Sequence, residues 1–211
     1  MSANHMRMAE AVDKLEAARA DLIHVDIIDG IFAPNISLGP AFVRDLNSQT
    51  STPIDVHMMV VNPLKYVETF RNAGADYISV HAETLDSASS LAYLRMQRDL
   101  GFIGGIALRP STQEPPWLRE RLSELGYLVP MSVEPGFSGQ KFIPSSMQRI
   151  SQYAEFRRES RLNFEIEADG GVTTANAPDI LQAGANILVA GAAVFDAPSV
   201  ADAIRALKEV K

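Results

Sequence analysis

Four residues, His24, Asp26, His57 and Asp169, have the types and spacing of a catalytic or metal-binding group. His24 and Asp26 are two positions apart in the apolar run IHVDIID, so their side chains point to the same face of a strand. His57 lies in IDVHMMV, and Asp169 ends the run FEIEAD before two glycines. Two imidazoles and two carboxylates around one point could hold a divalent metal. An acid on each side of a carbon could then move a proton from one face to the other.

Each of these residues also has a structural interpretation when it is taken alone. His24 and Asp26 could form a hydrogen-bonded pair, His57 could be a core histidine, and Asp169 could be a turn residue. Together, however, they all fall at the carboxyl ends of expected strands, which is where βα barrels carry their active sites. The set therefore favours a metal site, and it suits Zn²⁺, Fe²⁺, Mn²⁺ or Co²⁺ without choosing among them.

The elements that would position these side chains alternate along the chain. Short β-branched runs predict strands at 22–28, 54–60, 77–82, 103–108, 128–133, 164–169 and 187–190. Helical periodicity predicts helices that include 9–20, 64–73, 87–100, 145–158, 176–183 and 200–210. This alternation predicts parallel βα units in a single domain over 1–211. A closed barrel needs eight strands, so we expect an α/β fold of the TIM (β/α)8 type that lacks its first strand at the N-terminus.

Three further groups of residues would surround the mouth of such a barrel. Met59 and Met131 are either core filler or a dry lining around a charged intermediate. The glycine-rich stretch that follows 128–133 is either a long connection or a lid, and it contains Gly136, Phe137, Ser138 and Gly139. The turns after the last two strands provide either close packing or backbone N–H groups for a phosphate, and they contain Gly170, Gly171, Gly191 and Ala192.

Composition excludes several classes of function. The chain has no cysteine, so it has neither a disulfide nor a thiolate site. Its formal net charge of −7 argues against nucleic acid or an anionic membrane as a partner. No apolar run reaches the length of a membrane span, and no secretory leader is recognisable, so we expect a cytoplasmic protein.

Longer motifs around these residues carry a family resemblance that runs nearly end to end. The strings HVDIIDG, DVHMMV, MSVEPGF and DGGV stand at 24–30, 55–60, 131–137 and 169–172. In these strings the chain resembles the ribulose-phosphate 3-epimerase family of (β/α)8 barrels. The resemblance implies that His24, Asp26, His57 and Asp169 bind one divalent metal, and that Asp26 and Asp169 exchange a proton with C3 of a ketose phosphate.

The resemblance also implies a reaction and a substrate pocket. The reaction would be metal-dependent 3-epimerisation, D-ribulose 5-phosphate to D-xylulose 5-phosphate, through a metal-stabilised enediolate. His57, Met59 and Met131 would contact the substrate, the loop from Gly136 to Gly139 would close over it, and the phosphate would lie at Gly170, Gly171, Gly191 and Ala192. Family members commonly form homo-oligomers, so a homo-oligomer is expected here.

Two alternatives remain open on the sequence. One is the same chemistry on a related ketose phosphate such as D-allulose 6-phosphate. The other is a non-catalytic homologue that binds a sugar phosphate, which the absent strand would favour.

Overall fold

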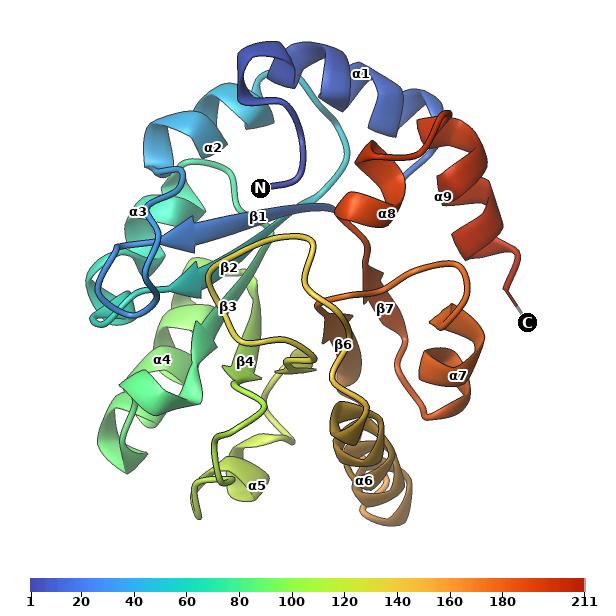
Figure 1. Ribbon diagram of the computed structural model, residues 1–211. Coiled ribbons are helices and arrows are strands. Elements are labelled where there is room, and N and C mark those ends of the chain that lie inside the picture. The colour runs from blue at the N-terminus through green and yellow to red at the C-terminus, as the bar shows by residue number, and fades with distance from the viewer. Residues whose placement is uncertain (211) are drawn as a thin grey trace.

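A curled sheet of seven parallel strands forms the centre of the molecule (Figure 1). The computed structural model describes residues 1–210. Its strands are β1 (Ile23–Ile28), β2 (Ile54–Met59), β3 (Tyr77–His81), β4 (Ile103–Leu108), β5 (Tyr127–Pro130), β6 (Glu165–Asp169) and β7 (Ile187–Val189). Each strand pairs in parallel with the next one along the chain. The predicted barrel-type α/β fold is therefore confirmed, with every predicted strand in place.

The fifth strand differs most from its prediction, because it ends at Pro130 and not at residue 133. Proline has no backbone N–H to donate to a neighbouring strand. After Pro130 the chain still forms backbone hydrogen bonds with both neighbouring strands. Met131 N–H donates to the Leu108 carbonyl of β4, and Ser132 N–H donates to the Asp169 carbonyl of β6, at 2.9 and 2.8 Å.

Helices follow the strands and cover the outer side of the sheet. They are α1 (Met8–Ala17), α2 (Pro40–Asn47), α3 (Val67–Asn72), α4 (Ser87–Leu100), α5 (Leu118–Arg121), α6 (Ser145–Glu159), α7 (Ala177–Gln182), α8 (Ala192–Phe195) and α9 (Val200–Lys208), with 3-10 turns η1 (His5–Arg7), η2 (Pro63–Lys65) and η3 (Ala82–Thr84). The sequence patterns did not predict α2, α5 or α8. Two of these have only four residues, which is too short for a helical period to show.

Local capping explains why α4 forms where its pattern predicts. The Asp86 side chain accepts a hydrogen bond from the Ser89 N–H, and the Ser89 hydroxyl accepts one from the Asp86 N–H. At the other end Gly101 takes a left-handed conformation, with φ +68°. Such a capping box and glycine cap satisfy backbone groups that a helix leaves free at its ends.

Strand β2 shows how the sheet separates core from site. All six of its residues are buried. Ile54, Val56 and Met58 belong to the main apolar core under the helices. Because side chains alternate along a strand, Asp55 and His57 point to the inner side of the curled sheet, where polar groups gather.

The sheet stays open between its first and last strands. Within residues 1–210 no hydrogen-bonded ladder joins β7 to β1, as expected for a barrel that lacks one strand. The helical layer nevertheless continues across this seam, since α1 contacts α9 (Figure 1). Lys208 strengthens that contact, because its Nζ donates to the Arg19 carbonyl at 2.6 Å and to Asp21 Oδ1 at 2.8 Å.

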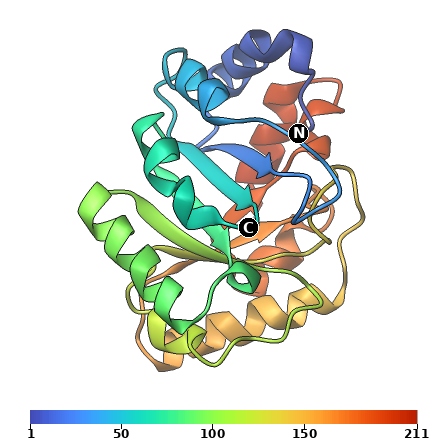
Figure 2. The same ribbon diagram turned by 90° about the vertical axis from the view of Figure 1, so that its left-hand side faces the viewer.

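The strands point towards one side of the molecule, which is the mouth of the half-barrel. In Figure 2 the arrowhead of β1 points to the side where the N-terminus and the long loop after β5 lie. A cavity of about 920 Å³ opens there and extends along the seam between β1 and β7. No helix within residues 1–210 has the length and apolar character needed to cross a bilayer.

Candidate metal and substrate site

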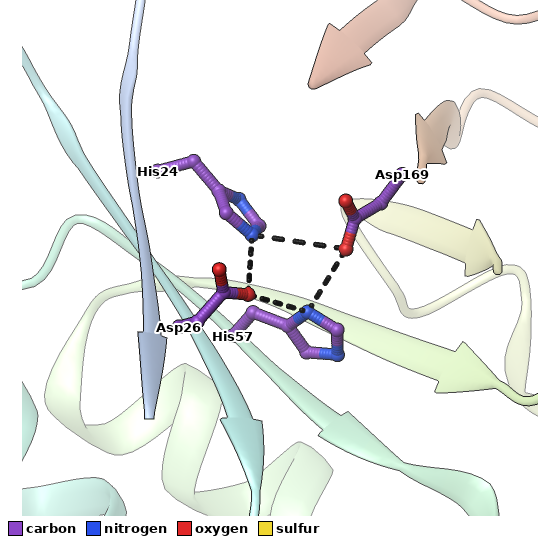
Figure 3. Close-up of side chains that lie close together, drawn as sticks. All are labelled: His24, Asp26, His57 and Asp169. Atoms are coloured by element: carbon purple, nitrogen blue, oxygen red, sulfur yellow. Dashed lines mark hydrogen bonds and ion pairs between the residues drawn. The ribbon is translucent and has the colours of Figure 1, made fainter. Parts of the chain in front are cut away.

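The four residues singled out by type and spacing converge at this mouth (Figure 3). His24 Nε2 lies 3.3 Å from Asp26 Oδ1 and 3.8 Å from Asp169 Oδ2. His57 Nδ1 lies 3.6 Å from Asp26 Oδ1 and 3.2 Å from Asp169 Oδ2. One nitrogen or oxygen from each residue lies within 4.8 Å of the others. The predicted convergence of two imidazoles and two acids is present.

Strand register explains how residues far apart in sequence meet. Asp26 on β1 is paired with His57 on β2 in the parallel ladder. Asp169 is the last residue of β6, and the curl of the sheet brings that strand end towards the first two. The two carboxylates therefore approach the imidazoles from different sides of the half-barrel, as a two-acid mechanism needs.

The donor set fits a divalent cation. His57 is fully buried, and its Nδ1 has no hydrogen-bond partner although it points into the cluster. A buried polar nitrogen without a partner is costly, and a metal ligand is one role that explains it. Two imidazole nitrogens and two carboxylate oxygens match the ligands that Zn²⁺, Fe²⁺, Mn²⁺ and Co²⁺ accept.

Electrostatics in the cluster favour charged groups. Burial alone would raise the pKa of Asp26, but the neighbouring imidazoles of His24 and His57 hold that pKa well below its usual range. Burial would lower the pKa of His57, but the neighbouring carboxylates, Asp169 above all, raise it to about 9. The pocket thus stabilises positive charge between its two acids, which is what a cation there needs.

A buried carboxylate supports the outer side of His24. Asp55 Oδ2 lies 2.6 Å from His24 Nδ1, and Tyr127 donates its hydroxyl to Asp55 Oδ1 at 2.8 Å. Tyr127 reaches across the interior from β5 because Gly105 leaves room. A Cβ on Gly105 would lie 2.5 Å from the tyrosine ring. Glu167, fully buried next to this group, has a pKa well above its usual range because of burial and the charge of Asp55.

Sequence reasoning did not assign roles to these supporting residues. Alternation along the strands was the available signal, since Asp55 shares a face with His57 and Glu167 shares one with Asp169. It did not show that Tyr127 on another strand would reach Asp55.

A second chain of polar contacts supports His57 and was also missed. His57 Nε2 lies 2.9 Å from His81 Nε2, and His81 Nδ1 lies 3.1 Å from Glu83 Oε2. His81 is the last residue of β3, so the strand-end rule could have selected it. The rule holds for Asp169 at the end of β6, but it is wrong for His24, which is the second residue of β1.

The other residues predicted to contact substrate line the cavity at the mouth. Of the predicted substrate-binding residues only His57, which is buried, does not line it. These lining residues are Met59, Met131, Gly136, Phe137, Ser138, Gly139, Gly170, Gly171, Gly191 and Ala192. Both methionines are buried, whereas Phe137 is 55% exposed. Asn35 ties the loop to the β1 side, because its Nδ2 donates to the Gly136 carbonyl at 2.8 Å.

Comparison with known proteins agrees with this geometry. The model of the ribulose-phosphate 3 epimerase family matches residues 1–195. This chain belongs to that family. It is 42% identical to a chloroplastic ribulose-5-phosphate-3-epimerase of Arabidopsis thaliana, over 100% of this chain and 75% of the relative. It is 42% identical to a ribulose-phosphate 3-epimerase of Synechocystis, over 100% of this chain and 91% of the relative.

Solved structures agree with the fold of this ribulose-phosphate 3-epimerase family member. A 3-hexulose-6-phosphate synthase aligns with a TM-score of 0.67 at 18% identity, covering 96% of this chain and 94% of that one. The structure titled KGPDC from Streptococcus mutans aligns with a TM-score of 0.73 at 14% identity, covering 99% and 92%. At such low identity these neighbours support the barrel-type architecture alone.

Proposed function

We propose that this chain is a metal-dependent epimerase that converts D-ribulose 5-phosphate to D-xylulose 5-phosphate by inverting C3. The observation that carries this proposal is the opposed pair Asp26 and Asp169 around one group of imidazoles. Membership of the ribulose-phosphate 3-epimerase family supports the choice of substrate.

The two aspartates would act as the acid and the base. One carboxylate removes the proton from C3, and the other, in its protonated form, delivers a proton to the opposite face. Both acids are only partly exposed, at 18% and 13%, and they open onto the cavity.

His24, Asp26, His57 and Asp169 would hold one divalent metal, which is Zn, Fe, Mn or Co. When bound, such an ion acts as a Lewis acid that makes the C3 proton easier to remove and offsets the negative charge that develops on the substrate. The buried methionines Met59 and Met131 would keep water from that charge.

The substrate phosphate would lie against the glycine turns after β6 and β7. Backbone N–H groups there can bind an anion without a lysine. Position 171 needs a glycine for two reasons. Its φ is +66°, and a Cβ there would lie 2.3 Å from the backbone nitrogen of Phe142. The loop from Gly136 to Gly139 would close over the sugar, so Phe137, now exposed, would become covered.

Solvent exchange tests the reaction directly. Incubation with D-ribulose 5-phosphate in D₂O is expected to yield D-xylulose 5-phosphate with deuterium at C3. The variant Asp169→Asn is expected to lose turnover by about 100- to 10,000-fold, because an amide neither takes nor gives the proton. The matched control Asp99→Asn, at an exposed position of α4, should keep wild-type rates. Full turnover in Asp169→Asn would remove that residue from the proton path.

Removing the metal and changing the substrate separate the alternatives. Removal of the metal by chelation, checked by elemental analysis, should abolish deuterium exchange. Adding back Zn²⁺, Fe²⁺, Mn²⁺ or Co²⁺ one at a time should show which ion restores it. The ratio of kcat/KM for D-ribulose 5-phosphate and D-allulose 6-phosphate should favour the pentose. Binding of either sugar without deuterium incorporation would indicate a non-catalytic sugar-phosphate binder.

The single domain, the homo-oligomeric state and the cytoplasmic location stay predictions. Light scattering on the purified protein measures the oligomeric state. A single cooperative unfolding transition would agree with a single domain.

A further inference from the structure

His57 contacts protein groups through both of its ring nitrogens, and the two sides differ in chemistry. Nδ1 faces Asp26 and Asp169. Nε2 lies 2.9 Å from Nε2 of His81, whose Nδ1 in turn lies 3.1 Å from Glu83 Oε2. Glu83 ends this series, which runs from β2 through β3 into the turn η3.

Hydrogen-bond polarity determines where the protons in this series lie. An ionised carboxylate only accepts, so the proton between His81 and Glu83 belongs to His81 Nδ1. A neutral His81 then has a bare Nε2, which must accept. The proton between the two imidazoles therefore belongs to His57 Nε2. Nδ1 is then the nitrogen that faces the two aspartates and binds a cation once its own proton is released.

The surroundings of Glu83 agree with an ionised carboxylate. Its Oε1 accepts the backbone N–H of Arg109 at 2.8 Å. Burial would raise the pKa of Glu83, but hydrogen bonds, with that from His81 the largest, lower it to about 2.

Packing shields the two imidazoles of the series from bulk water. His57 and His81 are both fully buried. The ring of Phe32 lies 4.5 Å from that of His81, centroid to centroid, and the Arg109 guanidinium carbon lies 4.0 Å from the centre of the Phe32 ring. Protein groups therefore decide which nitrogen of each imidazole bears the proton.

We infer that His81 and Glu83 are positioning residues that hold His57 as the Nε2–H tautomer and thereby present Nδ1 to the divalent cation. This inference rests on the metal site of the proposed function. His24 is held in the opposite sense. Its Nδ1 lies 2.6 Å from Asp55 Oδ2, so its Nε2 faces the cation. The two imidazole ligands would thus use different nitrogens, each determined by a carboxylate, directly by Asp55 for His24 and through His81 by Glu83 for His57.

Nitrogen NMR of the Zn²⁺-loaded, ¹⁵N-histidine-labelled full chain tests the inference without measuring turnover. The chain has only four histidines, so their two-bond ¹⁵N–¹H patterns can be assigned. We expect zinc on Nδ1 of His57 with a proton on Nε2, and zinc on Nε2 of His24. We also expect the proton of His81 on Nδ1. Zinc on His57 Nε2, a proton on His81 Nε2, or no zinc binding would overturn the inference.

A variant provides the second arm of the test. Glu83→Gln removes the charged acceptor but keeps the shape, and it is expected to weaken Zn²⁺ binding by about 10- to 100-fold in calorimetry. The matched control Glu120→Gln changes a glutamate whose side chain is 70% exposed and should leave the affinity unchanged. Wild-type affinity in a folded Glu83→Gln protein would contradict the proposed role. If that variant does not fold, the wild-type spectrum decides alone.

The outcome is distinguishable from failure of the proposed function. A protein that shows the expected tautomers but does not epimerise would refute the reaction and leave this inference standing. A protein that epimerises with His57 in the other tautomer would refute this inference and leave the proposed reaction standing.

Discussion

Single side chains at this site work in pairs, one that faces the cavity and one that supports it from behind. His24 depends on Asp55, which in turn accepts the Tyr127 hydroxyl. His57 depends on His81. A buried group whose partner is removed loses more than the hydrogen bond, because it was desolvated on folding. The supporting residues should therefore affect both stability and metal binding.

Removal of the Tyr127 hydroxyl tests this coupling. Tyr127→Phe leaves the buried Asp55 carboxylate without its hydroxyl donor, so the free energy of unfolding should fall by about 1.5–3 kcal/mol in urea titrations. Zinc affinity should fall as well, because His24 would be held less firmly. Tyr66→Phe, at a 46% exposed tyrosine, serves as the control and should change stability by less than about 0.5 kcal/mol. Equal losses in the two variants would show that Asp55 gains nothing from Tyr127.

Loops that follow neighbouring strands form the mouth, and their fit depends on backbone approach. The turn at Gly170 and Gly171 after β6 packs directly against the loop after β5, where Phe142 lies. Ser132 also joins the two, since its hydroxyl oxygen lies 2.8 and 2.7 Å from the carbonyl oxygens of Asp169 and Gly170, which share its one proton. Asp169 is thus held by its strand and by a neighbouring loop.

Two glycine substitutions separate conformational strain from this close contact. Gly171 and Gly139 both have positive φ, +66° and +74°, but a Cβ on Gly139 would meet nothing within 4 Å. Gly139→Ala should therefore lose only about 1–2 kcal/mol of stability, from left-handed backbone strain. Gly171→Ala should lose more, and it should raise KM for the phosphorylated substrate because the turn must move. Similar losses in both unfolding titrations would contradict the close packing.

The whole molecule is a half-barrel whose helices close the ring more completely than its strands do. The edges of β1 and β7 both line the seam cavity, and unpaired strand edges are places where a further strand can add. The amino group of Met1 lies 3.8 Å from Asp26 Oδ2, at the mouth. A segment placed before Met1 would therefore join the chain at the mouth, beside the seam cavity that Met1 lines.

An engineered extension tests whether the seam accepts a strand. Adding about five or six β-branched residues before Met1, a typical strand length, should raise Tm. A gain of 1 kcal/mol corresponds to roughly 2–4 °C for a chain of this size. A Gly/Ser extension of equal length is the matched control and should leave Tm unchanged. No difference between the two extensions in thermal unfolding would show that the seam does not accept a strand.

The sequence alone predicted all seven strands, most of the helices, the barrel-type fold, the open seam and the convergence of His24, Asp26, His57 and Asp169. These predictions depend on local properties, because the periodicity of apolar residues and the positions of strand ends can be read from neighbouring residues. It also placed at the mouth the residues expected to contact substrate, which line the cavity there. Their role in binding stays a prediction.

Only the tertiary structure decided which residues support the imidazoles. Tyr127 reaches Asp55 because Gly105 leaves space across the interior, and no local pattern records that clearance. His81 meets His57 because β2 and β3 are neighbours at a particular register, with His57 opposite Ser79. Such contacts depend on how the sheet curls and on which side chains are small enough to let others pass, and these are properties of the folded chain.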